Sequence, residues 1–289
     1  MQKIKKALIK LARFIKFLTA NFKGVLLFMF IVYLLIPTSK QSIVNANLVR
    51  INLGGTIMDA TKVLGEIKEA RLSKSIKGVL FVIDSPGGAV APSIEIAYAI
   101  KELKQEKPVV AYAAGTIASG SYYAAIWSNK IIANPGSLVG SIGVIMQGYN
   151  VESLLEKIGV KTQTAKAGDF KEAGTMHRVW TKIERDELEK VINNTYKMFV
   201  TDVANARSLK IKDEKHFANA HIFTSQGALD VGLIDQVGTI SDAIESLKAL
   251  THVKKIIWKE PTALDNFVER LSTSFGQTLQ TFFPTMVLK

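Results

Sequence analysis

The sequence predicts an α/β protein in which repeated strand-turn-helix units form a mostly parallel sheet. Residues 78–83 (GVLFVI) are a continuous apolar run rich in β-branched side chains, and the turn at residues 84–88 (DSPGG) ends it. This pattern is typical of a buried parallel strand. Residues 108–112 and 130–133 are further runs of this kind, and stretches with helical periodicity separate the three. Three successive units of this size predict an α/β domain.

The remaining elements follow in chain order. Residues 45–53 alternate between polar and apolar side chains, as a strand does, and two glycines end the run. We expect residues 221–235 to form a strand, a short helix and a turn, and residues 254–258 to form a last strand. Helical periodicity is present at residues 60–72, 92–105, 181–207 and 241–250. The third of these helices is strongly charged, which favours a position at the surface or at a subunit contact.

Much of the positive charge lies before the first apolar run. The formal net charge is +12, and seven of the 37 basic residues lie within residues 1–23, with no acidic residue before Asp59. A twelve-residue apolar run, residues 25–36, follows directly. Basic residues before an apolar segment are what the positive-inside rule describes. The charge therefore indicates membrane topology, and nucleic-acid binding is not expected.

Three interpretations of this segment stay open. Twelve apolar residues are short for a membrane span and typical of a signal peptide. Including residues 17–22 gives about twenty residues interrupted by Lys23, whose long side chain can snorkel to the interface. An uncleaved anchor, forming an N-terminal transmembrane helix, is favoured over a cleaved signal and a buried soluble helix. The predicted domains are a basic cytoplasmic head and anchor at 1–40, a main domain at 41–255 and a helical tail at 256–289.

Composition and motifs exclude several kinds of site. The chain has no cysteine, so disulfides, zinc-thiolate sites and cysteine nucleophiles are excluded. No His-Glu-x-x-His or comparable motif predicts a metal, and no glycine-rich segment has the lysine or spacing of a nucleotide site. A Ser-His-Asp triad using Asp84 is not expected, because no histidine lies in a glycine-flanked turn after a strand. The four histidines are His177, His216, His221 and His252. We therefore expect no metal and no cofactor.

The residues around Ser119 are suited to nucleophilic catalysis. Ser119 lies among small residues that follow a predicted strand and open a helix, so a substrate backbone can approach its hydroxyl. Gly120 supplies an adjacent backbone N–H, and Gly87 and Gly88 follow the preceding strand. Loops at the carboxyl ends of neighbouring parallel strands converge on one crevice. The backbone N–H groups of these glycines can therefore form an oxyanion hole.

Lys171 is the candidate general base. A lysine with its ordinary pKa near 10.4 is a poor base at neutral pH, and lowering that pKa to about 7 costs about 4 to 5 kcal/mol of desolvation. Ser141 is a hydroxyl that could orient the neutral amine, and Lys166 is the nearest competitor for the role. These residues predict a Ser/Lys hydrolase. The neutral lysine requires a pocket from which water is excluded, and such a pocket could form only when subunits assemble.

Five motifs resemble, in order and spacing, those of the signal peptide peptidase A (protease IV) family, which has the Clp-protease/crotonase fold. They are residues 84–88 (DSPGG), 118–122 (ASGSY), 140–145 (GSIGVI), 167–171 (AGDFK) and 227–235 (GALDVGLID). Any one of them would be weak, but all five in order are specific. The resemblance spans about residues 45–250.

The resemblance implies roles for particular residues. The implied nucleophile is Ser119 and the implied general base is Lys171. Ser141 is the serine implied to hydrogen-bond the lysine, and Gly87 and Gly88 form the implied oxyanion loop. One position departs from the family, which usually has glycine where this chain has Ser121. We expect Ser121 to place a second hydroxyl and some bulk near the substrate. The single copy of the fold resembles the family's short form and implies a ring-like homo-oligomer whose neighbouring subunits complete the dyad.

The resemblance also implies a substrate and a location. It implies a membrane-anchored serine endopeptidase that degrades cleaved signal peptides and other apolar or unfolded peptides. The implied location is the bacterial inner membrane, with one pass, the N-terminus inside and the catalytic domain extracytoplasmic. Two alternatives stay open: a catalytically silent scaffold or peptide-binding protein of the same fold, and a crotonase-type acyl-CoA enzyme. The export-type head argues against the second, because acyl-CoA is a cytoplasmic substrate.

Overall fold

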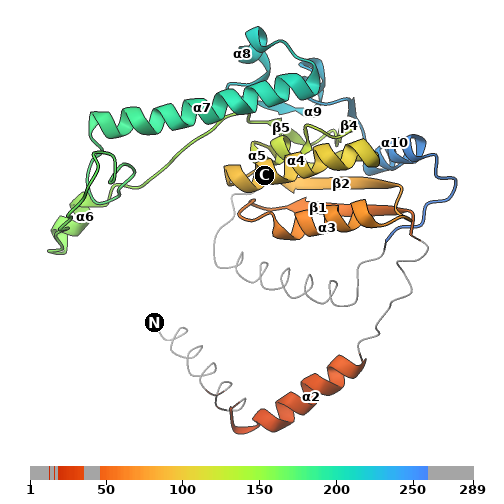
Figure 1. Ribbon diagram of the computed structural model, residues 1–289, viewed down its shortest axis with the longest axis horizontal. Coiled ribbons are helices and arrows are strands. Elements are labelled where there is room, and N and C mark those ends of the chain that lie inside the picture. Colours follow the sequence, from red (N-terminus) through yellow and green to blue (C-terminus); the bar gives the residue numbers. More distant parts are fainter. Residues whose placement is uncertain (1–12, 14–15, 17–18, 36–45, 260–289) are drawn as a thin grey trace. The chain divides into compact units, whose positions relative to one another are not determined.

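A computed structural model describes residues 13, 16, 19–35 and 46–259 (Figure 1). Helix α2 (Phe22–Leu35) belongs to a different compact unit from the one formed by Asn45–Trp258. Among these residues, no helix is both long enough and apolar enough to cross a membrane. The helix predicted for the tail lies outside the described residues from position 260 onward.

The unit Asn45–Trp258 contains a sheet with helices around it. The strands are β1 (Leu48–Gly54), β2 (Gly78–Ser85), β3 (Val109–Ala118), β4 (Lys130–Ala133), β5 (Leu138–Gly140), β6 (Ile222–Thr224) and β7 (Gln236–Val237). The helices are α3 (Thr61–Leu72), α4 (Val90–Glu106), α5 (Gly120–Ala125), α6 (Glu152–Lys157), α7 (Lys182–Arg207), η1 (Ile211–Asp213), α8 (Glu214–Phe217), α9 (Ser225–Asp230) and α10 (Ile240–Thr251).

The sheet is mostly parallel, in the order β1-β2-β3-β4-β7. Strand β4 pairs with the first half of β3, and β5 pairs in parallel with its second half, at Thr116–Ala118. Strand β6 adds the single antiparallel pair among the described strands. The predicted α/β fold with a mostly parallel sheet is confirmed. The carboxyl ends of β2, β3 and β5 consequently lie at one edge of the sheet.

Alternate residues of β2, β3 and β4 face two separate cores. On β2, Val79, Phe81 and Ile83 pack into the larger core, which includes residues of α3, α4, α5 and α7. Leu80, between them, packs with α10 on the opposite face. Each of these four side chains is fully buried, and burial of one apolar side chain stabilises a fold by roughly 1.5 to 3 kcal/mol. The continuous apolar run in the sequence reflects burial of both faces.

The last predicted strand, residues 254–258, is wrong. Only Trp258 of this segment forms a bridge, with Leu48. The side chain of Asn47 explains the difference, since its amide donates to the Lys255 carbonyl at 2.8 Å and accepts from the Ile257 N–H at 2.9 Å. The Asn47 side chain thus occupies backbone groups of Lys255 and Ile257 that, in a regular strand, would hydrogen-bond to the backbone of a neighbouring strand.

Candidate active site

Ser119 lies in a strained turn between β3 and α5. Its backbone has φ 54° and ψ −124°, a conformation that residues other than glycine rarely adopt. Such strain costs on the order of 1–3 kcal/mol and persists where the surrounding structure holds it. The Ser119 N–H donates to the Gly140 carbonyl at 2.8 Å, and its carbonyl accepts from Tyr123 at 3.0 Å. The turn leaves the serine half-buried at the carboxyl end of the sheet.

The predicted oxyanion glycines lie beside this serine. Ile57 bonds to the Gly87 carbonyl and the Ala89 N–H in a parallel bridge, so the N–H of Gly88 faces away from Ile57. That nitrogen lies 3.3 Å from where a Cβ on Gly120 would lie. Within the described residues, the N–H groups of Gly88 and Gly120 have no hydrogen-bond partner. Two free donors next to the Ser119 hydroxyl are what an oxyanion hole requires.

Gly87 supports this loop through its conformation. Its φ is +95°, and a Cβ there would lie 2.6 Å from the Gly120 nitrogen and 2.7 Å from the Ala118 carbonyl. Glycine is therefore required for the close approach of the two loops. Ser141 also comes to this edge, directly after Gly140, with its N–H bonded to the His221 carbonyl at 2.7 Å. The structure thus brings Ser119, Ser141 and the three glycines together. The Gly87 N–H donates to the Ser85 hydroxyl at 3.1 Å, so the prediction that it is an oxyanion donor is wrong, and the catalytic roles of the other residues stay predictions.

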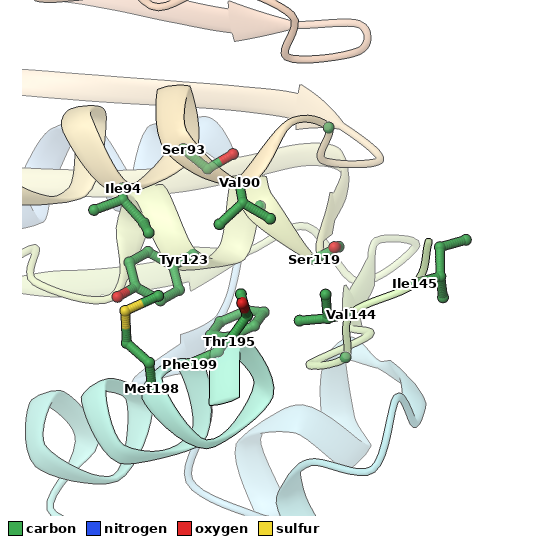
Figure 2. Close-up of a pocket in the computed structure, with 13 residues that line it drawn as sticks. Val90, Ser93, Ile94, Ser119, Tyr123, Val144, Ile145, Thr195, Met198 and Phe199 are labelled. Carbon is green, nitrogen blue, oxygen red and sulfur yellow. The ribbon is translucent and has the colours of Figure 1, made fainter. Parts of the chain in front are cut away.

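An apolar pocket of about 110 Å³ opens beside Ser119 (Figure 2). Ser119 lies toward one end of it, while Tyr123, Met198 and Phe199 gather toward the other. A cavity of about 150 Å³ can hold a benzene molecule, so this pocket has room for one smaller apolar side chain. Burial and a hydrogen bond to Asp202 raise the pKa of Tyr123, which keeps its hydroxyl neutral in the pocket wall.

Sequence reasoning missed the pocket wall supplied by α7. Thr195, Met198 and Phe199 line the pocket, whereas the sequence suggested only a surface or subunit-contact helix. The rings of Phe199 and Tyr123 are 4.7 Å apart between centroids. The apolar pair Phe199 and Val203, four residues apart near the end of a charged helix, was the available signal.

Ser121 does not lie where we expected. It is fully buried and does not line the pocket, so the prediction of a second hydroxyl near the substrate is wrong. Its Oγ donates to the Ser85 carbonyl at 2.6 Å and accepts from the Ala118 N–H at 2.9 Å. One helical position after Gly120 the side chain turns toward the sheet, because the neighbouring strands offer these two backbone groups.

Lys171 lies elsewhere, in the arm, which we define as residues 150–194 and which extends from the sheet (Figure 1). It is exposed, in a turn where its N–H bonds to the Gly168 carbonyl at 3.3 Å. Within the described residues its side chain has no ion pair, whereas Lys166 is paired with Glu172 at 2.9 Å. Of the two lysines, Lys171 is therefore the one whose amine is free of an ionic partner.

An ionic cluster attaches the Lys171 turn to the start of α7. Glu172 accepts from Lys166 at 2.9 Å and from Arg178 at 3.0 Å, and Arg178 also makes two bonds to Glu184 at 2.6 and 2.8 Å. Glu184 completes a capping box with Thr181 at the helix N-terminus. These contacts link the turn to the helix end that lies away from the pocket.

The cluster fixes how far Lys171 is from Ser119. Glu184 lies at the cluster and Thr195 at the pocket, about three turns of α7 apart, roughly 16 Å along the helix axis. A lysine side chain cannot bridge that distance. The structure therefore does not bring Lys171 to Ser119 within one chain.

Acid is expected to loosen the arm. Hydrogen bonds from Lys166 and Arg178 lower the pKa of Glu172 from its ordinary 4.5 to about 2. A carboxylate with a depressed folded-state pKa contributes stability that is present above pH 4.5 and is lost as the pH falls toward 2. We expect the protection factors of amide hydrogens in residues 150–194, which are corrected for intrinsic exchange, to fall in this window, and to fall more than those in β2 and β3. Glu172→Gln is the control and should reduce the pH dependence without abolishing it, because the hydrogen bond from Arg178 also lowers the pKa of Glu184 in the same cluster. Arm protection that follows the sheet strands throughout would contradict the prediction.

Other chemistry at this site has little support. None of the four histidines lines the pocket, although the His221 carbonyl binds Ser141. Asp84, the partner considered for a triad, instead accepts from the Thr116 N–H at 2.8 Å. In the part of the chain that the structure describes, no group of three His, Asp or Glu residues could hold a metal ion.

A strained serine after a parallel strand, beside an apolar pocket and two N–H groups without a partner among the described residues, is the arrangement that a serine-type hydrolase requires. The model of peptidase family S49 matches residues 101–254, and the chain belongs to this family. The predicted family is confirmed. Membership of a peptidase family also favours peptide hydrolysis over acyl-CoA chemistry.

Relatives and a solved structure agree with this family. A Methanocaldococcus jannaschii protein named "Putative protease MJ0651" is 38% identical over 220 residues, which are 76% of this chain and 69% of that protein. An Enterococcus faecium protein named "Putative signal peptide peptidase SppA" is 32% identical over 242 residues, 78% of this chain and 70% of that protein. In fold, a mutant of the membrane-bound stomatin-specific protease 1510-N is similar, with TM-score 0.52 and 15% identity, covering 75% of this chain and 99% of that one.

Proposed function

We propose that this chain is a membrane-anchored serine endopeptidase in which Ser119 is the nucleophile and Lys171 of a neighbouring copy is the general base. The observation that carries the proposal is the strained Ser119 turn beside the free N–H groups of Gly88 and Gly120. Strained backbone conformations are concentrated at functional sites, where they hold a reactive group in a fixed position, here the Ser119 hydroxyl. The adjoining apolar pocket supports a peptide substrate with an apolar side chain next to the scissile bond.

The proposed reaction proceeds through an acyl-enzyme. The neutral Lys171 amine takes the Ser119 proton as Oγ bonds to the substrate carbonyl carbon, and the N–H groups of Gly88 and Gly120 bind the resulting oxyanion. The peptide C–N bond then breaks, and the lysine returns the proton to the leaving amine. Water hydrolyses the ester in a second cycle of the same transfers. Ser141, beside Ser119, would hydrogen-bond the amine and aim its lone pair.

Assembly would supply what one chain lacks. A neutral lysine requires desolvation, and Lys171 of a single chain is exposed. The arm carries exposed apolar side chains around it, among them Phe170, Met176 and Val179. Apolar patches of this kind mark protein interfaces. A ring-like homo-oligomer could bury this surface and place each Lys171 at the Ser119 of a neighbour.

The proposed substrates are cleaved signal peptides and other apolar or unfolded peptides at the extracytoplasmic face of the bacterial inner membrane. The basic residues 1–23 and the apolar run 25–36 support a single-pass anchor with the N-terminus inside. The name of the Enterococcus faecium relative supports the substrate class. An anchored ring would meet apolar peptides where they leave the bilayer.

The test is Ser119→Ala in the full-length, assembled protein. We expect hydrolysis of an unstructured apolar fluorogenic peptide to fall by about 10⁴-fold or more, since binding and the oxyanion donors leave only a residual rate. A fluorophosphonate should label the unaltered chain but not the variant. Ser137→Ala, which removes another buried serine hydroxyl, is the control and should keep the activity. Hydrolysis that survives Ser119→Ala would mean that another residue is the nucleophile, and a complete lack of hydrolysis by the unaltered protein would favour a silent scaffold.

A further inference from the structure

The Ser121 hydroxyl bridges strands β2 and β3 where their pairing is irregular. Ile83 pairs with Ala113, but the next pair joins Ser85 to Ile117, so β3 has two more residues than β2 between these pairs. Directly after this irregularity, Ser121 Oγ accepts from the Ala118 N–H of β3 at 2.9 Å. The same atom donates to the Ser85 carbonyl of β2 at 2.6 Å. The Ala118 carbonyl lies at 2.9 Å, but a hydroxyl has one hydrogen and the Ser85 contact is shorter.

The two residues that Ser121 joins are those that carry the catalytic loops. Ala118 directly precedes Ser119, and Ser85 begins the glycine loop, which we define as residues 85–88. The Ser85 hydroxyl in turn accepts from the Gly87 N–H at 3.1 Å. Ser85 and Ser121 are both fully buried, so water does not compete for these bonds. Ser121 and Ser85 therefore connect the Ser119 turn to Gly87, through one hydrogen bond to the Ser85 carbonyl and another to the Ser85 hydroxyl.

We propose that Ser121 is a positioning residue that holds the Gly88 and Gly120 N–H groups in register with each other. The proposal rests on the proposed function, because these N–H groups are its oxyanion donors. The donors come from different strands, so their separation depends on what joins β2 to β3 at this point. A misplacement of about 1 Å in a catalytic site can reduce the rate by about 100-fold. Ser121 thus acts through the oxyanion hole and does not touch the substrate.

Substitutions of Ser121 by glycine and by alanine can separate a bridging role from a packing role. Glycine leaves the space of Cβ and Oγ empty, and one water bound to Ser85 and Ala118 could occupy it. Alanine fills part of that space and supplies no hydrogen-bonding group. A bridging role therefore predicts that kcat decreases in the order Ser, Gly, Ala. A packing role predicts the order Ser, Ala, Gly, because glycine loses more packing and more helix propensity.

The experiment compares Ser121→Ala and Ser121→Gly with the unaltered full-length protein, using the apolar fluorogenic peptide at a temperature where all are folded. For Ser121→Ala we expect kcat to fall about 10- to 100-fold with KM within about twofold, because the donors act mainly in the transition state. Affinity for a peptide aldehyde, whose adduct with Ser119 places an oxygen in the oxyanion hole, should fall in parallel. Affinity for the product peptide should stay unchanged.

Ser137→Ala is the matched control. Ser137 is also buried, and its hydroxyl donates to the Ala113 carbonyl of β3 at 3.0 Å, away from the glycine loop. Its loss should lower stability and leave kcat unchanged. If Ser121→Ala left kcat unaltered, or if kcat decreased in the order Ser, Ala, Gly, the positioning role of Ser121 would be overturned and the proposed function would stand. Hydrolysis that survives Ser119→Ala would overturn the proposed function and this role with it.

Discussion

Co-assembly of equal amounts of Ser119→Ala and Lys171→Ala chains should restore peptidase activity that neither variant has alone. The arm holds Lys171 about three turns of α7 away from the pocket at Ser119 in the same chain. If each site takes its serine from one copy and its lysine from a neighbour, random mixing gives an intact site at about one quarter of the positions. Activity should therefore rise from near zero to about one quarter of the unaltered value.

The measurement is hydrolysis of the apolar fluorogenic peptide after mixed refolding or co-expression. A mixture of Ser119→Ala with the double variant Ser119→Ala/Lys171→Ala is the control, since it has no intact serine in any arrangement. Lys166→Ala should keep substantial activity, because Lys166 binds Glu172 and is not the proposed base. No recovery in the mixed sample, with normal assembly, would mean that the dyad is not shared between copies.

The fold could be predicted from the sequence where short-range pattern decides the structure. The apolar run at 78–83 lies in β2, as predicted, because a strand buried on both faces needs apolar residues throughout. The DSPGG segment that follows it ends the strand and contains the glycine loop. The small residues around Ser119 likewise indicated a turn that a substrate can approach. Both features depend on residues adjacent in the chain.

Features that depend on distant segments could not be predicted. Strand β5 has only three residues and exists because β3 extends past β4, which leaves its second half to pair. The orientation of Ser121 depends on the Ser85 carbonyl of the neighbouring strand, 36 positions earlier. The distance of Lys171 from Ser119 depends on an ionic cluster and a helix that no local pattern relates to the pocket.

Gly88→Ala is expected to have the second large effect. A Cβ at Gly88 would lie 2.1 Å from the Ile57 carbonyl oxygen and 2.6 Å from its nitrogen, so the glycine loop must move. That movement breaks the bridge in which Ile57 bonds to Gly87 and Ala89 at 2.9 and 2.7 Å. Forcing an extra methyl into packed structure costs roughly 1–3 kcal/mol. The displaced Gly88 N–H can no longer meet the oxyanion, and loss of one such donor lowers kcat by about 10²- to 10³-fold.

Gly54→Ala separates this effect from a general intolerance of alanine at strand ends. Gly54 ends the neighbouring strand β1, and a Cβ there would meet only the Asp84 carbonyl, at an ordinary 3.9 Å. The control should change stability by less than about 0.5 kcal/mol and leave kcat unchanged. Urea unfolding and kcat for the apolar peptide, measured on both variants, test the prediction. If Gly88→Ala lost stability but kept its kcat, the oxyanion would have to be bound by donors other than the Gly88 N–H.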